Sequence, residues 1–355
     1  MVTNAKMYVR TQPKLNSISK FEEQIVFQKS DSKLKYESEL RTRMNSYIKQ
    51  LFVKLRRSEM DSTSILFKRN QMNRYNVTFD GRRGSRNPSV QSVCKLSFDT
   101  LTKSSKTNKK EIEQCLPRVS LKFLLSRSKR KTCALVTNAG SLLHSKKGKE
   151  IDSHDIVLRF NNAPTNGFEK DVGSKTTLRI LNSQVVSRAT FNVSQSKLFE
   201  NNILLVWDPS HYRENLSQWI KSPEHNFVHN YCKSRIESPR TPFYILDPSL
   251  IWNAWYTLQE STLNSIPKNP PSSGFLGLIL LMKLCSTVNV YEYIPSIRLT
   301  EKCHYYDNSS GLGCTLGEWH PLATEKLYAI NLNRASDYEV FVEGKMTIRG
   351  CSQII

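Results

Sequence analysis

His320 stands directly before Pro321, and a helix-compatible pattern continues from Leu322 to Asn331. Because proline is favoured at the first position of a helix, this spacing predicts that His320 is the N-cap residue. The positive end of the helix dipole disfavours the imidazolium form there, so a neutral base stays available to take a proton from an attacking hydroxyl group. The alternative is a histidine that caps a helix and does no chemistry. Glu325, about 140° around the helix, is expected to brace the surrounding loop.

Three asparagines follow predicted strands. Asn138 lies in the small-residue turn that ends the run Cys133–Ser141, and Asn161 and Asn182 come just past two further strands. Amide side chains can donate to ribose or phosphate oxygens and accept from hydroxyl groups, so these positions favour a nucleotide. The turn lacks the Gly-x-Gly-x-x-Gly pattern and is not a P-loop. The alternative for an asparagine after a strand is turn formation.

Ser272, Ser273 and Gly274 open a predicted helix. Free backbone N–H groups and hydroxyl groups at such a position can hold a carboxylate, although serine also caps helices without binding anything. No Asp-x-Asp sequence occurs, which fits chemistry without a metal ion. No cysteine pair has the Cys-x-x-Cys spacing, so no metal site is expected.

From Cys133 onward, short β-rich runs alternate with helical patterns. This alternation predicts an α/β fold with a Rossmann-like, mostly parallel sheet flanked by helices. Sheets of this kind bind ligands at the carboxyl ends of their strands, where the asparagines lie. The apolar run Ser273–Leu284 predicts a buried helix. The predicted strands are Cys133–Thr137, Ile156–Phe160, Thr177–Leu181, Ile203–Trp207, Phe243–Leu246 and Val288–Tyr293.

The formal net charge of +21 lies almost wholly in the first third of the chain. Residues 1–132 hold 30 of the 52 Lys and Arg residues but 11 of the 31 Asp and Glu residues. Such a segment can bind nucleic acid through counterion release, yet no zinc-finger spacing, RNP-like motif or zipper accompanies the charge. A solvated spacer is therefore expected, with attraction to anionic headgroups as a further possibility. No nucleic-acid partner is expected.

Four stretches resemble the sialylmotifs of the animal sialyltransferase family, in the family's order. The run from Cys133 to Gln184 resembles the large motif, and Pro271 through Cys285 to Tyr293 resembles the small motif. Cys303-His304-Tyr305-Tyr306-Asp307 is similar to the third motif. His320-Pro-Leu-Ala-Thr-Glu325 is similar to the very small motif. The resemblance covers roughly residues 133–351.

The resemblance implies the sialyltransferase variant of the GT-A-like fold. It also implies transfer of sialic acid from CMP-sialic acid to the terminal galactose of glycoprotein or oligosaccharide acceptors, by an inverting displacement without metal or cofactor. Pro270-Pro271-Ser-Ser-Gly and Trp207-Asp208-Pro209-Ser210 are similar to the β-galactoside α-2,6-sialyltransferases, which favours an α-2,6 linkage. The alternatives are an α-2,3-linking or GalNAc-directed sialyltransferase, or a catalytically silent glycan-binding member of the fold.

Particular roles follow from the same resemblance. Asn161 and Asn182 are implied to bind CMP, and Gln184 to contact the acceptor galactose. His304 and Tyr305 are candidates to donate to the charge that grows on the departing phosphate. The catalytic candidates are thus His320 and His304, and the further substrate-binding candidates are Asn138, Ser272, Ser273, Gly274 and Trp319.

Eight cysteines and four Asn-x-Ser/Thr sequons fit an oxidising lumen. Within the motif framework, the predicted disulfides are Cys133–Cys285, Cys303–Cys314 and Cys94–Cys351. Cys115 and Cys232 are left over, and Cys115 could instead replace Cys94.

Residues 1–90 are predicted to be a basic, stem-like region ending in a linker, and residues 91–355 the catalytic domain. Because no motif lies in residues 1–80, their removal is expected to leave activity intact. The resemblance implies the Golgi lumen and a type II membrane protein, with galactose-terminated N-glycans as partners. No membrane anchor is visible in the sequence.

Overall fold

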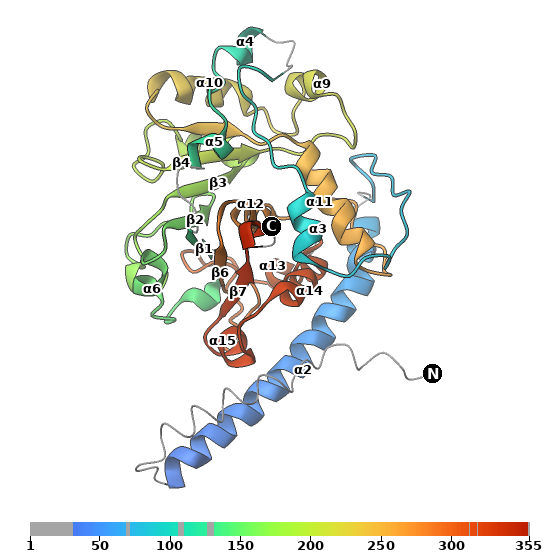
Figure 1. Ribbon diagram of the computed structural model, residues 1–355, viewed down its shortest axis with the longest axis vertical. Coiled ribbons are helices and arrows are strands. Elements are labelled where there is room, and N and C mark those ends of the chain that lie inside the picture. The colour runs from blue at the N-terminus through green and yellow to red at the C-terminus, as the bar shows by residue number, and fades with distance from the viewer. Residues whose placement is uncertain are drawn as a thin grey trace.

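The computed structural model describes residues 31–68, 72–105, 110–125, 131–311, 313–317 and 319–353. Residues 1–30 of the predicted stem-like region lie outside this part of the chain. At the centre is one sheet in the order β5-β4-β3-β2-β1-β6-β7, with helices on both faces (Figure 1). The strands are β1 (Thr132–Val136), β2 (Ile156–Phe160), β3 (Leu178–Asn182), β4 (Ile203–Trp207), β5 (Phe243–Ile245), β6 (Thr287–Tyr291) and β7 (Lys345–Arg349).

The first six strands are parallel, and β7 runs antiparallel to β6 at one edge. Helices cover both faces, so the inner strands are almost continuously apolar, and all five residues of β2 are buried. The six predicted strands are present, with ends shifted by one or two residues in four of them. The sequence pattern does not predict β7, because only Met346 and Ile348 are buried between partly exposed polar residues.

Helix α12 (Ser273–Leu284) matches its predicted bounds and feeds β6. It is apolar on nearly all sides because it lies in the core between the sheet and other helices. At Gly277 a Cβ atom would lie 2.7 Å from a methyl carbon of Leu158 and 2.9 Å from the ring of Phe160. Glycine at this position therefore lets the helix backbone approach the sheet closely.

The remaining helices pack around this centre. On one face, α11 (Ser249–Glu260), α12 and α14 (Leu322–Leu332) share the largest apolar cluster; on the other, α8 (Ser183–Ser187), α9 (Leu216–Lys221) and α10 (Val228–Glu237) form a second one. The shorter helices are α3 (Val90–Lys95), α4 (Lys110–Glu113), α5 (Leu121–Leu125), α6 (Gly148–Asp152), α7 (Glu169–Val172), α13 (Gly313–Leu316) and α15 (Asp337–Phe341), with 3-10 turns at Gly140–Leu142, Ala189–Phe191 and Cys351–Gln353.

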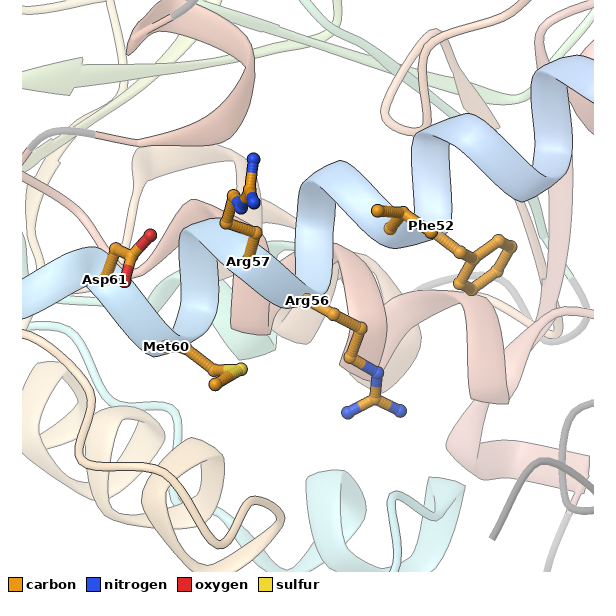
Figure 2. A pocket seen from close by; sticks show the side chains of 6 residues that line it. Phe52, Arg56, Arg57, Met60 and Asp61 are labelled. Carbon is orange, nitrogen blue, oxygen red and sulfur yellow. The ribbon is translucent and has the colours of Figure 1, made fainter. Parts of the chain in front are cut away.

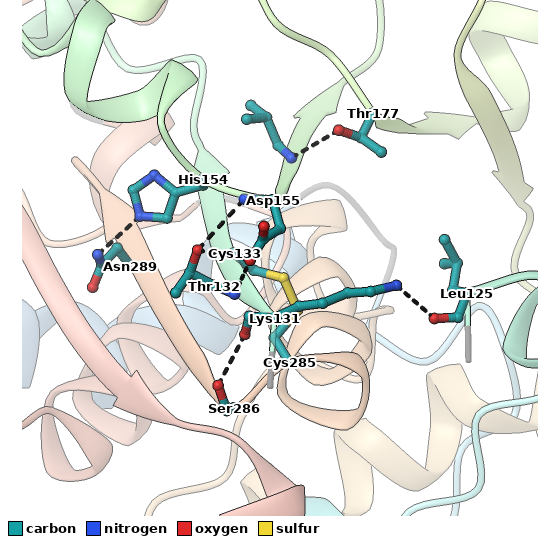
Figure 3. The surroundings of a disulfide bond; sticks show 11 residues. Leu125, Lys131, Thr132, Cys133, His154, Asp155, Thr177, Cys285, Ser286 and Asn289 are labelled. Atoms are coloured by element: carbon teal, nitrogen blue, oxygen red, sulfur yellow. Dashed lines mark hydrogen bonds between the residues drawn. A yellow bond between two sulfur atoms is a disulfide. The ribbon is translucent and has the colours of Figure 1, made fainter. Parts of the chain in front are cut away.

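All eight cysteines are paired. Cys133 in β1 is joined to Cys285 directly after α12, which fixes the helix to this inner strand (Figure 3). Beside this bond the N–H group of Thr132 donates to the Asp155 carboxylate at 2.8 Å. The structure also contains the pairs Cys94–Cys351 and Cys303–Cys314 that were predicted. Cys115 pairs with Cys232 and does not replace Cys94.

Helix α2 (Asp31–Lys68) is the long blue helix in Figure 1. It packs Met44, Leu51 and Leu55 into the main core. In the segment after α2, Asp80 accepts a hydrogen bond from the hydroxyl of Tyr256 on α11 at 2.7 Å. The domain boundary at residue 90 stays a prediction. Helix α2 and the segment after it, which precede that boundary, contact the sheet domain. Within the described ranges, no helix is both long and apolar enough to span a bilayer.

Candidate active site

The predicted nucleotide-binding residues share one edge of the sheet. Asn138 follows β1, Asn161 follows β2, and Asn182 is the last residue of β3. Asn182 is also the register partner of Trp207, which ends β4. Because parallel strands end at the same edge, the fold gathers these side chains where α/β sheets bind ligands.

Asn161 and Asn182 are hydrogen-bonded to each other. The N–H group of Asn182 donates to Oδ1 of Asn161 at 2.9 Å, and Oδ1 of Asn182 caps α8 by accepting from the N–H group of Val185 at 3.1 Å. Asn161 has a φ of 48°, in the left-handed region that asparagine tolerates. Both amide oxygens thus accept from backbone N–H groups, one across to the end of β3 and the other at the start of α8. Neither Nδ2 atom donates to any described residue, so both can donate to a nucleotide.

Asn138 links the turn after β1 to the third motif. Its backbone oxygen accepts from the N–H group of Tyr305 at 3.0 Å, and its Nδ2 donates to the hydroxyl of Tyr306 at 3.2 Å. Its Oδ1 is buried and has no partner among the described residues. A buried acceptor without a donor is costly, and a ligand hydroxyl or amino group would satisfy it. These features suit a substrate-binding residue, and that role stays a prediction.

Tyr305 and Tyr306 have different environments. Tyr305 is 3% exposed and its hydroxyl donates to the backbone oxygen of Pro164. Burial raises the pKa of Tyr305 to about 12, although two nearby buried arginines lower it. Its hydroxyl is therefore engaged with the loop after β2. Tyr306 is only half-buried and its hydroxyl lies against Asn138, which makes it a candidate site residue that the sequence reasoning missed.

His304 stacks on Tyr306, with ring centroids 5.1 Å apart and planes at 3°. Its Nδ1 lies 2.8 Å from Oδ2 of Asp307. Burial raises the pKa of Asp307, but hydrogen bonds from His304 and Ser309 outweigh burial and lower it overall. The ionised carboxylate accepts from Nδ1, which leaves Nε2 as the ring atom able to donate to a phosphate when the imidazole is doubly protonated.

Ser272 is the N-cap of α12, and its hydroxyl oxygen accepts from the third N–H group of the helix at 3.2 Å. Its own N–H and hydroxyl donate to the Glu325 carboxylate at 2.7 and 2.5 Å. The bracing role expected for Glu325 is confirmed by these bonds. Ser272 therefore caps the helix, as the alternative interpretation of this serine predicts. Its N–H group and hydroxyl are already hydrogen-bonded within the protein.

Ser273 and Gly274 differ from Ser272. The Ser273 hydroxyl oxygen accepts from Nε1 of Trp207 at 2.8 Å, and its proton has no acceptor among the described residues. The N–H groups of Ser273 and Gly274 lie in the first turn of α12, where no carbonyl group of the helix can accept from them. These donors can hold an anionic group such as a carboxylate.

His320 lies one residue outside its predicted position. Helix α14 begins at Leu322 with Pro321 as N-cap, so the N-cap prediction for His320 is wrong. Nδ1 of His320 lies 2.7 Å from the backbone oxygen of Pro270. A carbonyl oxygen only accepts, so Nδ1 carries the proton and Nε2 keeps a lone pair. Burial lowers the pKa of His320 below its ordinary value, against the Glu325 carboxylate and the Pro270 carbonyl, which raise it. Burial thus favours the neutral form of the ring, and its role as the base stays a prediction.

Aromatic rings flank His320. The Trp319 ring meets His320 edge-on at 4.6 Å, and the Trp207 ring lies 6.4 Å from it. Trp207 therefore connects His320, Ser273 and the end of β3, a position that the sequence could have indicated because Trp207 closes a predicted strand. Gln184 is exposed on α8, two residues after β3, and forms no hydrogen bond with His320.

Two further findings concern other places where a ligand or a metal ion could bind. A hollow of about 490 Å³ lies along α2 between Phe52 and Asp61, and it contains none of the predicted site residues (Figure 2). In the described part of the chain, no three His, Cys, Asp or Glu side chains come together in a way that could hold a metal ion.

The model of glycosyltransferase family 29 (sialyltransferase) matches residues 82–336. The beta-galactoside alpha-2,6-sialyltransferase 2 of Bos taurus is 43% identical over 287 residues, covering 79% of this chain and 58% of that protein. The Homo sapiens protein of the same name is 42% identical over 283 residues, covering 78% and 53%. The chain thus spans about half the length of these curated relatives.

A solved structure described as a mammalian sialyltransferase is 22% identical, with a TM-score of 0.44, and covers 68% of this chain and 80% of that one. The family model covers well over half of the chain and includes every predicted catalytic and substrate-binding residue. The chain belongs to glycosyltransferase family 29, the sialyltransferases.

Proposed function

We propose that this protein transfers sialic acid from CMP-sialic acid to the terminal galactose of glycoprotein or oligosaccharide acceptors, in α-2,6 linkage. The observation that carries the proposal is the hydrogen bond from Nδ1 of His320 to Pro270, which leaves Nε2 able to accept a proton. Family membership supports the donor, and the names of the relatives support galactose and the α-2,6 linkage.

In the proposed reaction, a galactose hydroxyl attacks the anomeric carbon of sialic acid while the bond from that carbon to the CMP phosphate oxygen breaks. Nε2 of His320 takes the hydroxyl proton, CMP leaves with the bonding electron pair, and the configuration inverts. His304 donates to the phosphate oxygens as their charge grows. The Nδ2 atoms of Asn161 and Asn182 bind the nucleotide.

The sialic acid carboxylate is proposed to bind in the first turn of α12. The Ser273 hydroxyl and the N–H groups of Ser273 and Gly274 supply donors there. Gln184 and Trp319 are proposed for the acceptor side, and Tyr305 holds the loop after β2. The proposed reaction needs neither metal nor cofactor, and its proposed setting is the Golgi lumen with galactose-terminated N-glycans as acceptors.

The test is to incubate the protein with CMP-sialic acid and a lactosamine acceptor and to determine the product linkage by NMR. His320→Ala should lose at least about 100-fold in turnover and still bind CMP, because general base catalysis is worth that much. His229→Ala, at an exposed histidine on α10, is the matched control. An α-2,3 product corrects the linkage, and no product in the wild type favours a silent glycan-binding member. Turnover of folded His320→Ala within about threefold of wild type removes this base from the mechanism.

A further inference from the structure

Helix α2 carries a buried carboxylate in its apolar stripe. Leu51, Leu55 and Glu59 follow one another at four-residue intervals and are 3%, 1% and 1% exposed. This spacing places all three on one face of the helix, where a leucine at the third position would pack without desolvating a charge. Packing of the helix alone therefore does not explain a glutamate at position 59.

The carboxylate of Glu59 joins two other segments of the protein. Its Oε1 accepts from the hydroxyl of Thr324 at 3.0 Å, and its Oε2 accepts from Nδ2 of Asn264 at 3.1 Å. Arg56, one turn earlier on α2, lies 3.6 Å from the same Oε2 and is partly exposed. Thr324 belongs to the first turn of α14, and Asn264 to the loop that leads from α11 to α12.

These two segments are the ones that hold His320. Thr324 comes four residues after His320 and directly before Glu325. The loop that begins near Asn264 continues to Pro270, whose oxygen accepts from the His320 ring. A single carboxylate thus connects the segment that carries the imidazole to the segment that orients it.

A second contact of α2 also reaches the region around His320. The hydroxyl of Ser58 donates to the backbone oxygen of Leu316 at 3.0 Å, at the end of α13 and just before the segment that leads to His320. In the loop, Nδ2 of Asn269 donates to the backbone oxygen of Trp319 at 3.1 Å. Leu316 is therefore held from α2, and Trp319, directly before His320, is held from the loop.

We propose that Glu59 is a positioning residue for catalysis, which sets the distance and direction between the His320 ring and Pro270 from outside the family-matched region of residues 82–336. This proposal rests on the proposed role of His320 as the base. It reverses the expectation that residues 1–80 can be removed without loss of activity, since that removal would take away Glu59 and the buried residues of α2.

The test compares Glu59→Ala and Glu59→Gln, each in the untruncated chain of residues 1–355, with Tyr47→Phe. Tyr47 also ties α2 to the sheet domain, through a hydrogen bond from its hydroxyl to the backbone oxygen of Pro295 at 3.0 Å, and this bond involves neither α14 nor the loop from Asn264 to Pro270. The variants are compared in kcat, in KM for CMP-sialic acid, in the pH profile of kcat and in thermal midpoint.

Glu59→Ala should lower kcat by roughly 10-fold to 100-fold, since small displacements of a catalytic group cost that much. KM for CMP-sialic acid should stay within about twofold, because the predicted donor-binding atoms keep their places. The acid limb of the pH profile should move to higher pH, because a loosened His320 loses part of the burial that lowers its pKa. Tyr47→Phe should keep both kcat and the acid limb of the wild type.

A double-mutant cycle with Thr324→Val should give non-additive effects on kcat if Glu59 acts through Thr324. Should Glu59→Ala fail to fold, the isosteric Glu59→Gln carries the same expectations with a smaller loss. A folded Glu59→Gln or Glu59→Ala protein whose kcat and acid limb match those of Tyr47→Phe overturns the proposal. His320→Ala tests the role of the base independently of the Glu59 variants. The proposal for Glu59 can therefore be overturned while the proposal for His320 is retained.

Discussion

Glu325 of α14 accepts hydrogen bonds from both the backbone N–H group and the hydroxyl of Ser272, the N-cap of α12, at 2.7 and 2.5 Å. The hydroxyl of Tyr293, just after β6, donates to the same carboxylate at 3.3 Å. One fully buried side chain therefore joins the helix that follows His320 to the helix whose first turn is proposed to hold sialic acid. The proposed base and the proposed donor pocket depend on a common contact.

Glu325→Gln should lower kcat and move the acid limb of the kcat profile to lower pH. The Glu325 charge raises the pKa of His320, so its removal lets that pKa fall further and the neutral base persists at lower pH. The loss of kcat should be roughly 10-fold, from displacement of α14. Glu237→Gln, on the outer side of α10, serves as the control. An acid limb that rises or stays in place speaks against this coupling.

The wild-type pH profile gives a prediction of its own. Burial lowers the pKa of His320, so the base is neutral down to a pH below the ordinary histidine value of about 6.5. The rate should fall to half on the acid side below that pH. Steady-state assays from about pH 4.5 to pH 8 at saturating donor would measure this midpoint. A half-maximal point clearly above the ordinary value contradicts the placement of His320.

The neighbouring tyrosines of the third motif should respond differently to loss of their hydroxyl groups. Tyr306→Phe should raise KM for CMP-sialic acid, because its hydroxyl lies against Asn138 at the predicted nucleotide site. Tyr305→Phe should lower the free energy of unfolding by about 1 kcal/mol, since its buried bond to Pro164 is lost. Donor titrations and denaturant melts of the two variants provide the comparison. Equal effects of both variants on both quantities would refute the different roles.

Chelation should leave the rate unchanged. The sequence has no Asp-x-Asp pair, and CMP carries a single phosphate whose growing charge His304 and amide groups are proposed to meet. Turnover after dialysis against EDTA should equal that of an untreated sample. Activity that disappears with EDTA and returns with added manganese would require a different donor site.

Apolar patterning predicts the centre of this fold well. The parallel strands and α12 are buried on nearly all sides, so their runs of β-branched and aliphatic residues show in the sequence. Strand β7 lies at an edge of the sheet, where Lys345, Thr347 and Arg349 alternate with two buried residues. An alternation over only five residues is too short to distinguish a strand from a loop in the sequence. The sequence periodicity of α2 indicates a helix. It does not indicate that this helix packs against the sheet domain, because that packing is a tertiary contact.

The sequence indicates which residues are candidates for the site better than it indicates how their side chains are oriented. The motif residues indicated His320, Asn161 and the start of α12. Which of two adjacent tyrosines contacts the Asn138 side chain depends on how the third-motif loop packs, and adjacent residues in a loop show no periodicity. Likewise Pro270 orients His320 through its backbone oxygen, which no side-chain motif can indicate.

The disulfides Cys94–Cys351 and Cys115–Cys232 have a mechanical consequence. Cys351 lies just beyond β7, while Cys232 lies in α10 next to β5, so the two bonds reach opposite ends of the sheet. Cys94 and Cys115 thus connect one stretch of sequence covalently to both edges of the sheet, and the N–H group of Leu101 donates to the backbone oxygen of Ile245 on the β5 edge. Under pulling forces or brief unfolding, the two bonds limit how far the edges of the sheet can separate, and reduction of either bond would remove that limit.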